Sequence, residues 1–161
     1  MMRLVPFPAI IETTRVAITY QLLKERPENA NISHANMPSI EEHRQYVLRH
    51  PYRTWFLIEH AERTLPAQWV GSLYLTNQNE IGIFILAQHQ RKGYAARAIK
   101  LVLDGIPPLP AVPGRRTGQY LANVNPSNEA SIKLFTGLGA VHLQNTYTFS
   151  ERGKPWEPPQ T

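Results

Sequence analysis

Residues 80–103, EIGIFILAQHQRKGYAARAIKLVL, join an apolar run to a helical pattern across a short polar turn. The run at 80–87 is apolar at most positions, which is typical of a strand buried at the centre of a sheet. After Gly93, apolar residues recur at the i, i+3, i+4 spacing of one helix face, at Ile99, Val102 and Leu103. The sequence therefore predicts a central strand that leads directly into a helix.

Helical and strand-like segments are mixed along the rest of the chain. Residues 14–26 have near-helical apolar spacing, and Ser39 stands three residues before Glu42, which is the spacing of a capping box. Further strands are predicted at 2–5, 54–60, 68–76, 119–124 and 140–149. A last helix is predicted from Asn125 as N-cap, with Pro126 at its first position, to Gly139. This order predicts an α/β or α+β sheet with helices on its faces.

Length and composition exclude several classes of protein. The 161 residues suit one domain, expected at 1–150 with a loose tail at 151–161. The chain has no cysteine, which excludes disulfides and thiolate metal sites, and its six histidines form no H-E-x-x-H pattern, so no metal is expected. The N-terminal segment lacks a secretory pattern, and no apolar run is long enough to cross a bilayer. We expect a cytoplasmic protein that does not bind membranes.

The turn at 90–95 has the chemistry of a phosphate site. A helix N-terminus presents unpaired N–H groups and the positive end of its dipole. Gly93 lets the backbone approach an anion closely, and Arg91 and Lys92 add charge. The two standard phosphate loops, G-x-x-x-x-G-K-[ST] and G-x-G-x-x-G, are absent. The net charge of +5 therefore favours a phosphorylated cofactor over nucleic acid, for which no motif is present.

Two blocks of the sequence resemble the GNAT acetyltransferase family. Gln90-Arg91-Lys92-Gly93-Tyr94-Ala95 is similar to the signature Q/R-x-x-G-x-G/A between a strand and a helix. NPSNEASIKLFTGLGA, at 125–140, is similar to the second motif, N-x-x-S-x-x-L-[YF]-x-x-x-G-F. Order and spacing also match, apart from the proline-rich segment 106–118. The resemblance is specific over 80–139 and implies a mixed, mostly antiparallel sheet of roughly six to seven strands flanked by about four helices.

The resemblance implies that acetyl-CoA is the acyl donor. Its pyrophosphate would lie on the backbone amides of 91–96. Its pantetheine arm would pair with 83–86 like an added strand, where this strand splays from 119–124. The cofactor-binding residues that the resemblance implies are Ile83, Phe84, Ile85, Leu86, Arg91, Lys92, Gly93, Tyr94, Ala95, Ala96, Asn123, Asn128, Ser131 and Phe135.

The chemistry needs an amine without its proton and a donor for the oxyanion. By resemblance, a backbone N–H near Ile85 is the donor, and Glu80 is either the base, directly or through water, or a strand-edge glutamate in solvent. Ser131 is the second catalytic candidate. Phe135 stands where many members have a proton-donating tyrosine. Either Ser131, Tyr120 or Tyr147 protonates the thiolate, or no acid is needed, because a thiol of pKa about 8.5 leaves readily.

These residues imply an N-acetyltransferase that moves an acetyl group directly, in a ternary complex, to a primary amine of a small molecule or a protein N-terminus. The partners would be a small amine or a peptide, with no nucleic acid, and the protein a monomer or homodimer. The alternative is a non-catalytic acyl-CoA-binding or regulatory module on the same fold. The polar loop 31–39, with Ser33 and His34, is placed near the acceptor by resemblance, and His43 is interpreted as a surface histidine.

Overall fold

The computed structural model describes residues 1–27, 37–62 and 66–147. One antiparallel sheet has the strand order β1-β2-β3-β4. The strands are β1 (Met2–Pro6), β2 (Thr54–His60), β3 (Gln68–Leu75) and β4 (Ile81–Ile85). The helices are α1 (Glu12–Lys24), α2 (Ile40–Arg49), α3 (Tyr94–Gly105) and α4 (Glu129–Gly137), with short 3-10 helices η1 (Phe7–Ala9) and η3 (Ala87–His89).

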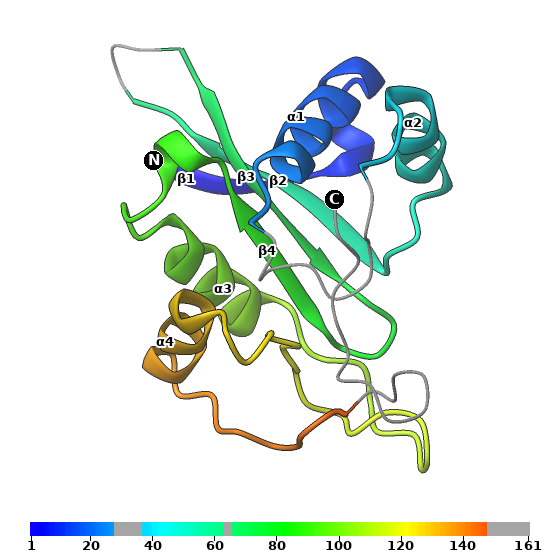
Figure 1. Ribbon diagram of the computed structural model, residues 1–161, viewed down its shortest axis with the longest axis vertical. Helices are drawn as coiled ribbons and strands as arrows, with labels where there is room; N and C mark the ends of the chain where they lie inside the picture. The colour runs from blue at the N-terminus through cyan, green and yellow to red at the C-terminus, as the bar shows by residue number, and fades with distance from the viewer. Residues whose placement is uncertain (28–36, 63–65, 148–161) are drawn as a thin grey trace, which may run out of the picture.

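The strand register sorts the side chains onto two faces of the sheet. Leu73 pairs with Phe56 of β2 and Ile83 of β4 on one face, and the preceding residue, Ser72, pairs with Phe84 on the other. Helices α3 and α4 lie on the Leu73 face, and α1 and α2 lie on the Ser72 face (Figure 1). The sheet therefore separates two cores, and β4 is an edge strand that contacts α3.

Local sequence signals set the ends of helices α2 and α3. Ser39 Oγ accepts a hydrogen bond from the Glu42 N–H, and the Glu42 carboxylate accepts one from the Ser39 N–H, so the predicted capping box forms. Helix α2 ends at His50, which has a φ of 46°, before Pro51. Helix α3 begins after Gly93, which has a φ of 75°, a conformation that glycine adopts without a steric penalty.

The proline-rich segment 106–118 has no regular helix or strand, as its prolines predict, but hydrogen bonds fix it in place. Asn79 is fully buried; its Nδ2 donates to the Leu109 carbonyl at 2.9 Å, and its Oδ1 accepts from the Leu109 N–H at 2.7 Å. Arg116 Nη1 donates to the Asn77 carbonyl at 2.9 Å. The segment is therefore held against the turn between β3 and β4.

The prediction of six to seven strands is wrong for the described residues, which form a four-stranded sheet. Residues 119–124 meet β4 only at a parallel bridge between Glu80 and Leu121, where the Ile81 N–H donates to the Leu121 carbonyl at 2.8 Å. Past this bridge, Asn123 Nδ2 donates to the Glu80 carboxylate at 2.7 Å. A side-chain contact thus stands where a strand ladder would continue, so the predicted fifth strand does not form.

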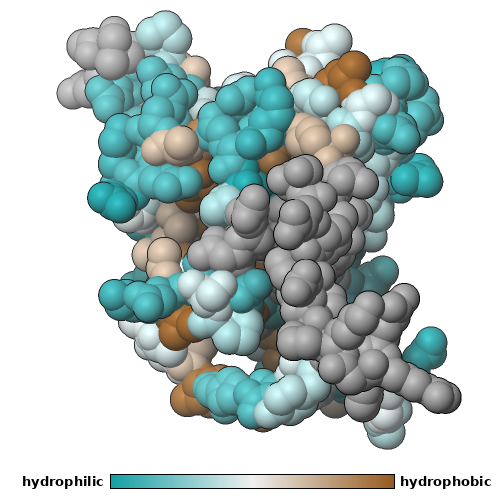
Figure 2. Space-filling view, viewed as in Figure 1, coloured by the Kyte–Doolittle hydropathy of each residue, from teal (hydrophilic) through white to brown (hydrophobic). Residues whose placement is uncertain are grey.

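The predicted strand at 140–149 is also absent over 140–147, while 148–149 and the predicted tail 151–161 lie outside the described residues. Val141 is 84% exposed and Tyr147 is 82% exposed. The apolar alternation exists, but no described strand lies beside it to take its backbone hydrogen bonds. Figure 2 shows hydrophobic residues exposed at the lower left, where α4 and the segment after it lie.

Helix α4 begins later than predicted, because Asn128 and not Asn125 is its N-cap. The Asn125 carbonyl accepts from the Asn128 N–H at 2.8 Å, and Asn125 Oδ1 accepts from the Ser127 N–H at 2.9 Å. Pro126 thereby takes the second position of a tight turn, where its fixed φ is favoured. Asn128 Oδ1 accepts from the Ser131 N–H at 3.1 Å and caps the helix.

Candidate functional site

The outer edge of β4 presents backbone groups that no described strand covers. The Leu86 N–H donates to the Val70 carbonyl at 3.0 Å, so the even-numbered residues of this strand direct their backbone groups toward β3. The odd-numbered residues direct theirs outward. Ile81 uses its outward N–H in the bridge described above, whereas Ile83 and Ile85 lie beyond that bridge. This edge can therefore accept an extended, amide-containing chain as an added strand.

The N-terminus of α3 presents a second set of backbone donors. The first hydrogen bond of the helix runs from the Arg97 N–H to the Gly93 carbonyl at 3.2 Å, so the amides of 94–96 have no intrahelical acceptor. No side chain of the described residues caps this helix end. Arg91 and Lys92 are exposed beside it, and Arg91 has a φ of 59°. Arg91 and Gly93, which both have a positive φ, thus turn the chain so that the free N–H groups lie beside the positive side chains. This arrangement can bind a phosphate group.

The turn that joins β4 to α3 is held by the end of α1. The Ala87 N–H donates to Glu25 Oε2 at 2.7 Å, and Gln90 Nε2 donates to the Ile85 carbonyl at 3.1 Å. The hydrogen bond from Ala87, followed by one from Gln21, lowers the pKa of the Glu25 carboxyl. A charged Glu25 therefore fixes the open strand edge relative to the helix N-terminus.

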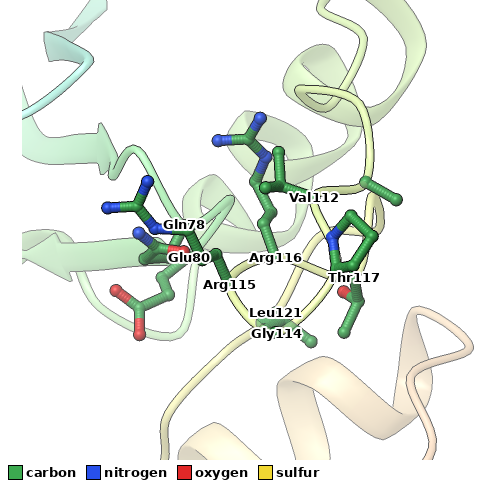
Figure 3. A pocket seen from close by; sticks show the side chains of 10 residues that line it. Gln78, Glu80, Val112, Gly114, Arg115, Arg116, Thr117 and Leu121 are labelled. Atoms are coloured by element: carbon green, nitrogen blue, oxygen red, sulfur yellow. The ribbon is translucent and has the colours of Figure 1, made fainter.

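Glu80 lies immediately before β4, and both of its carboxylate oxygens are hydrogen-bonded. Thr76 Oγ1 donates to Glu80 Oε2 at 2.9 Å, and Asn123 Nδ2 donates to Oε1. Glu80 also lines a hollow of about 600 Å³ between the β3–β4 turn and the proline-rich segment (Figure 3). Gln78 and Glu80 bound this hollow on the strand side, and Val112 and Thr117 bound it on the other (Figure 3). Glu80 is therefore oriented and accessible.

A second cavity, of about 280 Å³, lies on the opposite side of β4 from α3, between the sheet and helices α1 and α2. We call it the aromatic cavity; its lining includes Arg26, His43, Tyr46, Tyr52, Tyr74 and Phe84. The rings of Tyr52 and Tyr74 stack with centroids 3.8 Å apart, and the Tyr46 and Tyr52 hydroxyls are hydrogen-bonded. Its volume is close to the lower limit, about 300 Å³, for sites that bind small molecules.

Gly82 makes room for the wall of the aromatic cavity. A Cβ at Gly82 would lie 2.0 Å from Cζ of Tyr74, so the Tyr74 ring lies directly over the glycine. Burial raises the pKa of Tyr74, while the charge of Arg26 lowers it and the charge of Glu80 raises it. Arg26 lines the aromatic cavity beside this ring, whereas Glu80 lines the other hollow.

Residues 10–141 match the sequence profile described as "Acetyltransferase (GNAT) domain". The chain belongs to the GNAT acetyltransferase family. The search among curated proteins found no match.

Several solved structures match the chain at low sequence identity. A domain from Methanocaldococcus jannaschii matches with a TM-score of 0.62 and 21% identity, over 86% of each chain. The putative acetyltransferase yncA from Salmonella typhimurium, solved with its cofactor acetyl-CoA, matches with a TM-score of 0.57 and 17% identity, over 86% of this chain and 78% of that chain. A spermidine N-acetyltransferase from Vibrio cholerae matches at a TM-score of 0.47 and 22% identity, over 64% of this chain and 60% of that chain.

The structure places the predicted GNAT site residues in three groups. Ile83 and Ile85 have outward-facing backbones, whereas the backbones of Phe84 and Leu86 face β3. At the helix N-terminus, 91–93 are exposed and the Tyr94 side chain is buried in the core. On the C-terminal side, Asn123 bonds to Glu80, Asn128 and Ser131 form the cap of α4, and Phe135 packs against the core beneath α3.

The sequence analysis missed the aromatic cavity. His43 is only 6% exposed, so its interpretation as a surface histidine is wrong; its Nε2 lies 2.8 Å from Thr19 Oγ1, and burial lowers its pKa. Arg26 and Tyr74 belong to no motif, and they meet only because the sheet brings α1 and β3 together. Residues 28–36, which include Ser33 and His34 of the predicted acceptor loop, lie outside the described residues.

The described residues contain neither a membrane-spanning helix nor a cluster of metal ligands. No helix there is long and apolar enough to span a bilayer. No group of three or more histidine or acidic side chains in the same residues is placed to hold a metal ion.

Proposed function

We propose that this GNAT protein is an acetyl-CoA-dependent N-acetyltransferase that transfers an acetyl group to a primary amine in a ternary complex. The observation that carries the proposal is the continuity between the uncovered edge of β4 and the uncapped N-terminus of α3. An extended arm with amide groups and a diphosphate at one end needs these two features in this order along the chain.

The geometry supports the following binding roles. The amides of 94–96 and the charges of Arg91 and Lys92 hold the diphosphate, and Gly93 supplies the turn that exposes those amides. The outward backbone groups of Ile83 pair with the pantetheine amides, whereas Ile85 keeps only its N–H, because Gln90 occupies its carbonyl. The amide nitrogen of Asn128 remains for the arm, since Oδ1 is used in the helix cap.

The acceptor amine enters from the aromatic cavity, on the side of β4 opposite α3. Bound acetyl-CoA supplies an activated acetyl thioester. The amine nitrogen forms a bond to the carbonyl carbon, the carbon–sulfur bond breaks, and the thiolate leaves. Glu80 accepts the proton that the nitrogen loses, directly or through water, and the Ile85 N–H donates to the developing oxyanion.

The departing thiolate needs little help. Tyr120 donates its hydroxyl to the Ile106 carbonyl at 2.9 Å, Tyr147 is 82% exposed, and Phe135 has no proton to give. Ser131 is half-buried on the first turn of α4, and it is the remaining acid among the three hydroxyl residues considered. A thiol of pKa about 8.5 also leaves as the anion, so loss of Ser131 slows turnover only modestly.

One observation favours a second function, a non-catalytic acyl-CoA-binding module. Both oxygens of Glu80 already accept hydrogen bonds, from Thr76 and Asn123, so one of these bonds must break before Glu80 can take a proton from the amine. Such a module binds acetyl-CoA and does not consume it.

Turnover separates the two functions. Thiol release from acetyl-CoA is measured with a panel of primary amines, and the acetylated amine is identified by mass spectrometry. We expect amine-dependent turnover that falls by roughly 100-fold or more in Glu80→Gln, a typical loss for a general base. Acetyl-CoA binding without turnover across the panel would favour the module. Turnover unchanged in Glu80→Gln would remove Glu80 as the base.

A further inference from the structure

Arg26 follows α1 and directs a guanidinium into the aromatic cavity without an acidic partner among the described residues. Its Cζ lies 4.1 Å from the centroid of the Phe84 ring, and its Nε is buried without a hydrogen-bond partner among the residues that the structure describes. No described carboxylate lies within ion-pair distance of it. Burial lowers the pKa of Arg26, but a guanidinium stays protonated in proteins, so the cavity holds a partly desolvated positive charge.

The other charges of the cavity do not neutralise Arg26. Arg49 adds a second cation to the lining. Glu42 is the one carboxylate among the described lining residues, and it is bonded to the N–H and hydroxyl of Ser39 at the start of α2. His43 is neutral near pH 7, because burial lowers its pKa below the ordinary value. The cavity is therefore positive, and its carboxylate is already engaged.

We propose that the acceptor amine carries an anionic group, a carboxylate or a phosphate, which pairs with Arg26 in the aromatic cavity; this inference rests on the proposed function. A guanidinium binds both anions through two parallel hydrogen bonds. The pairing offsets the desolvation of Arg26, for which the described residues supply the Phe84 ring but no carboxylate. The stacked tyrosines line the same space and provide apolar contact for the remainder of a small acceptor.

The positive lining also discriminates against polycationic amines. A polyamine would place a second ammonium near Arg26 and Arg49, where like charges repel and no free described carboxylate compensates. The inference therefore separates two classes of acceptor by charge.

Matched pairs of amines test the inference by kcat/KM. One pair is an amino acid and its amide, the other is O-phosphoethanolamine and ethanolamine, and spermidine represents polyamines. We expect the anionic member of one pair to exceed its neutral partner by roughly 100-fold, as for a buried charge pair, and spermidine to be a poor acceptor. The pair that shows the difference identifies the anion as carboxylate or phosphate.

Variants assign the preference to Arg26. Arg26→Met should abolish the preference and leave acetyl-CoA affinity unchanged, and Arg26→Lys should restore part of it. Arg15→Met is the matched control. Arg15 is in α1 and, like Arg26, places its Cζ over an aromatic ring, 5.9 Å from the centroid of Phe7, but it does not line the cavity. Circular dichroism and thermal unfolding establish that each variant is folded.

Three results would overturn the inference. They are equal or better use of neutral amines or spermidine by the wild type, an unchanged preference in folded Arg26→Met, and a loss of acetyl-CoA affinity in that variant. If Arg26→Met does not fold, calorimetry of the anionic amine on wild type with bound CoA decides, since no binding there contradicts the inference. Failure of the wild type to bind acetyl-CoA at all would instead overturn the proposed function, and the inference with it.

Discussion

The side chain of Asn79 connects the turn between β3 and β4 to the proline-rich segment through two hydrogen bonds, and replacing it by alanine removes both of them. Its amide makes two hydrogen bonds to the backbone of Leu109 and is fully buried. Each bond contributes about 1 kcal/mol to the free energy of unfolding. Asn79 also has a φ of 64°, and alanine in that region costs about 1 kcal/mol more. We therefore expect Asn79→Ala to lower the free energy of unfolding by about 3 kcal/mol.

Urea unfolding followed by tryptophan fluorescence measures this loss, and tryptic cleavage after the exposed Arg115 reports the release of the segment. Asn79→Gly should be about 1 kcal/mol less destabilised than Asn79→Ala, because glycine accepts the positive φ. Asn77→Ala is the matched control in the same turn, where an exposed side chain predicts a change within about 0.5 kcal/mol. A loss below about 1 kcal/mol in Asn79→Ala, with unchanged cleavage, would refute the reasoning.

Three other changes have directions set by the structure. Gly82→Ala forces the Tyr74 ring from its position, so it should destabilise the fold by about 2 kcal/mol and raise KM for the amine. Gly137→Ala is the control: a Cβ there has open space in α4, so this variant should be neutral or stabilising in thermal unfolding. Ser39→Ala should cost about 1 kcal/mol of unfolding free energy in urea through the lost cap, and an unchanged midpoint would contradict this. The pKa of Glu25 is lower in the folded protein than in the unfolded chain, where it is about 4.3. Its contact with Ala87 therefore stabilises the fold fully above the unfolded pKa, and this contribution is lost as the pH falls through the lower folded pKa. The difference in unfolding free energy between wild type and Glu25→Gln should shrink over that pH range.

Much of the fold follows from local sequence signals. The capping box at Ser39, the strands β2 and β3 and the helix start after Gly93 agree with the predictions, because each depends on residues a few positions apart. The N-cap of α4 was misplaced, since Asn125 and Asn128 both have capping chemistry and only the turn geometry at Pro126 distinguishes them.

Long-range features were beyond the sequence. The strand predicted at 119–124 has suitable residues, but whether it pairs depends on the neighbouring edge, where Asn123 bonds to the side chain of Glu80. The aromatic cavity depends on the register that places Tyr74 over Gly82, and on the approach of Arg26 to Phe84. These contacts join distant segments, so no local pattern contains them.

The central claim is that the start of α3 binds the diphosphate of acetyl-CoA. Calorimetry of acetyl-CoA on wild type, Gly93→Asn and Gly93→Asp tests it most directly. Nothing lies within 4 Å of a Cβ at Gly93, so neither side chain clashes, and both residues tolerate a positive φ better than most. The two variants differ by one negative charge beside the diphosphate.

The account predicts binding by the wild type in the micromolar range, a modest loss in Gly93→Asn and a further loss of about tenfold or more in Gly93→Asp. Near-ultraviolet circular dichroism should show that all three proteins are folded. Failure of a folded wild type to bind acetyl-CoA, or equal affinities of the two variants, would contradict the account.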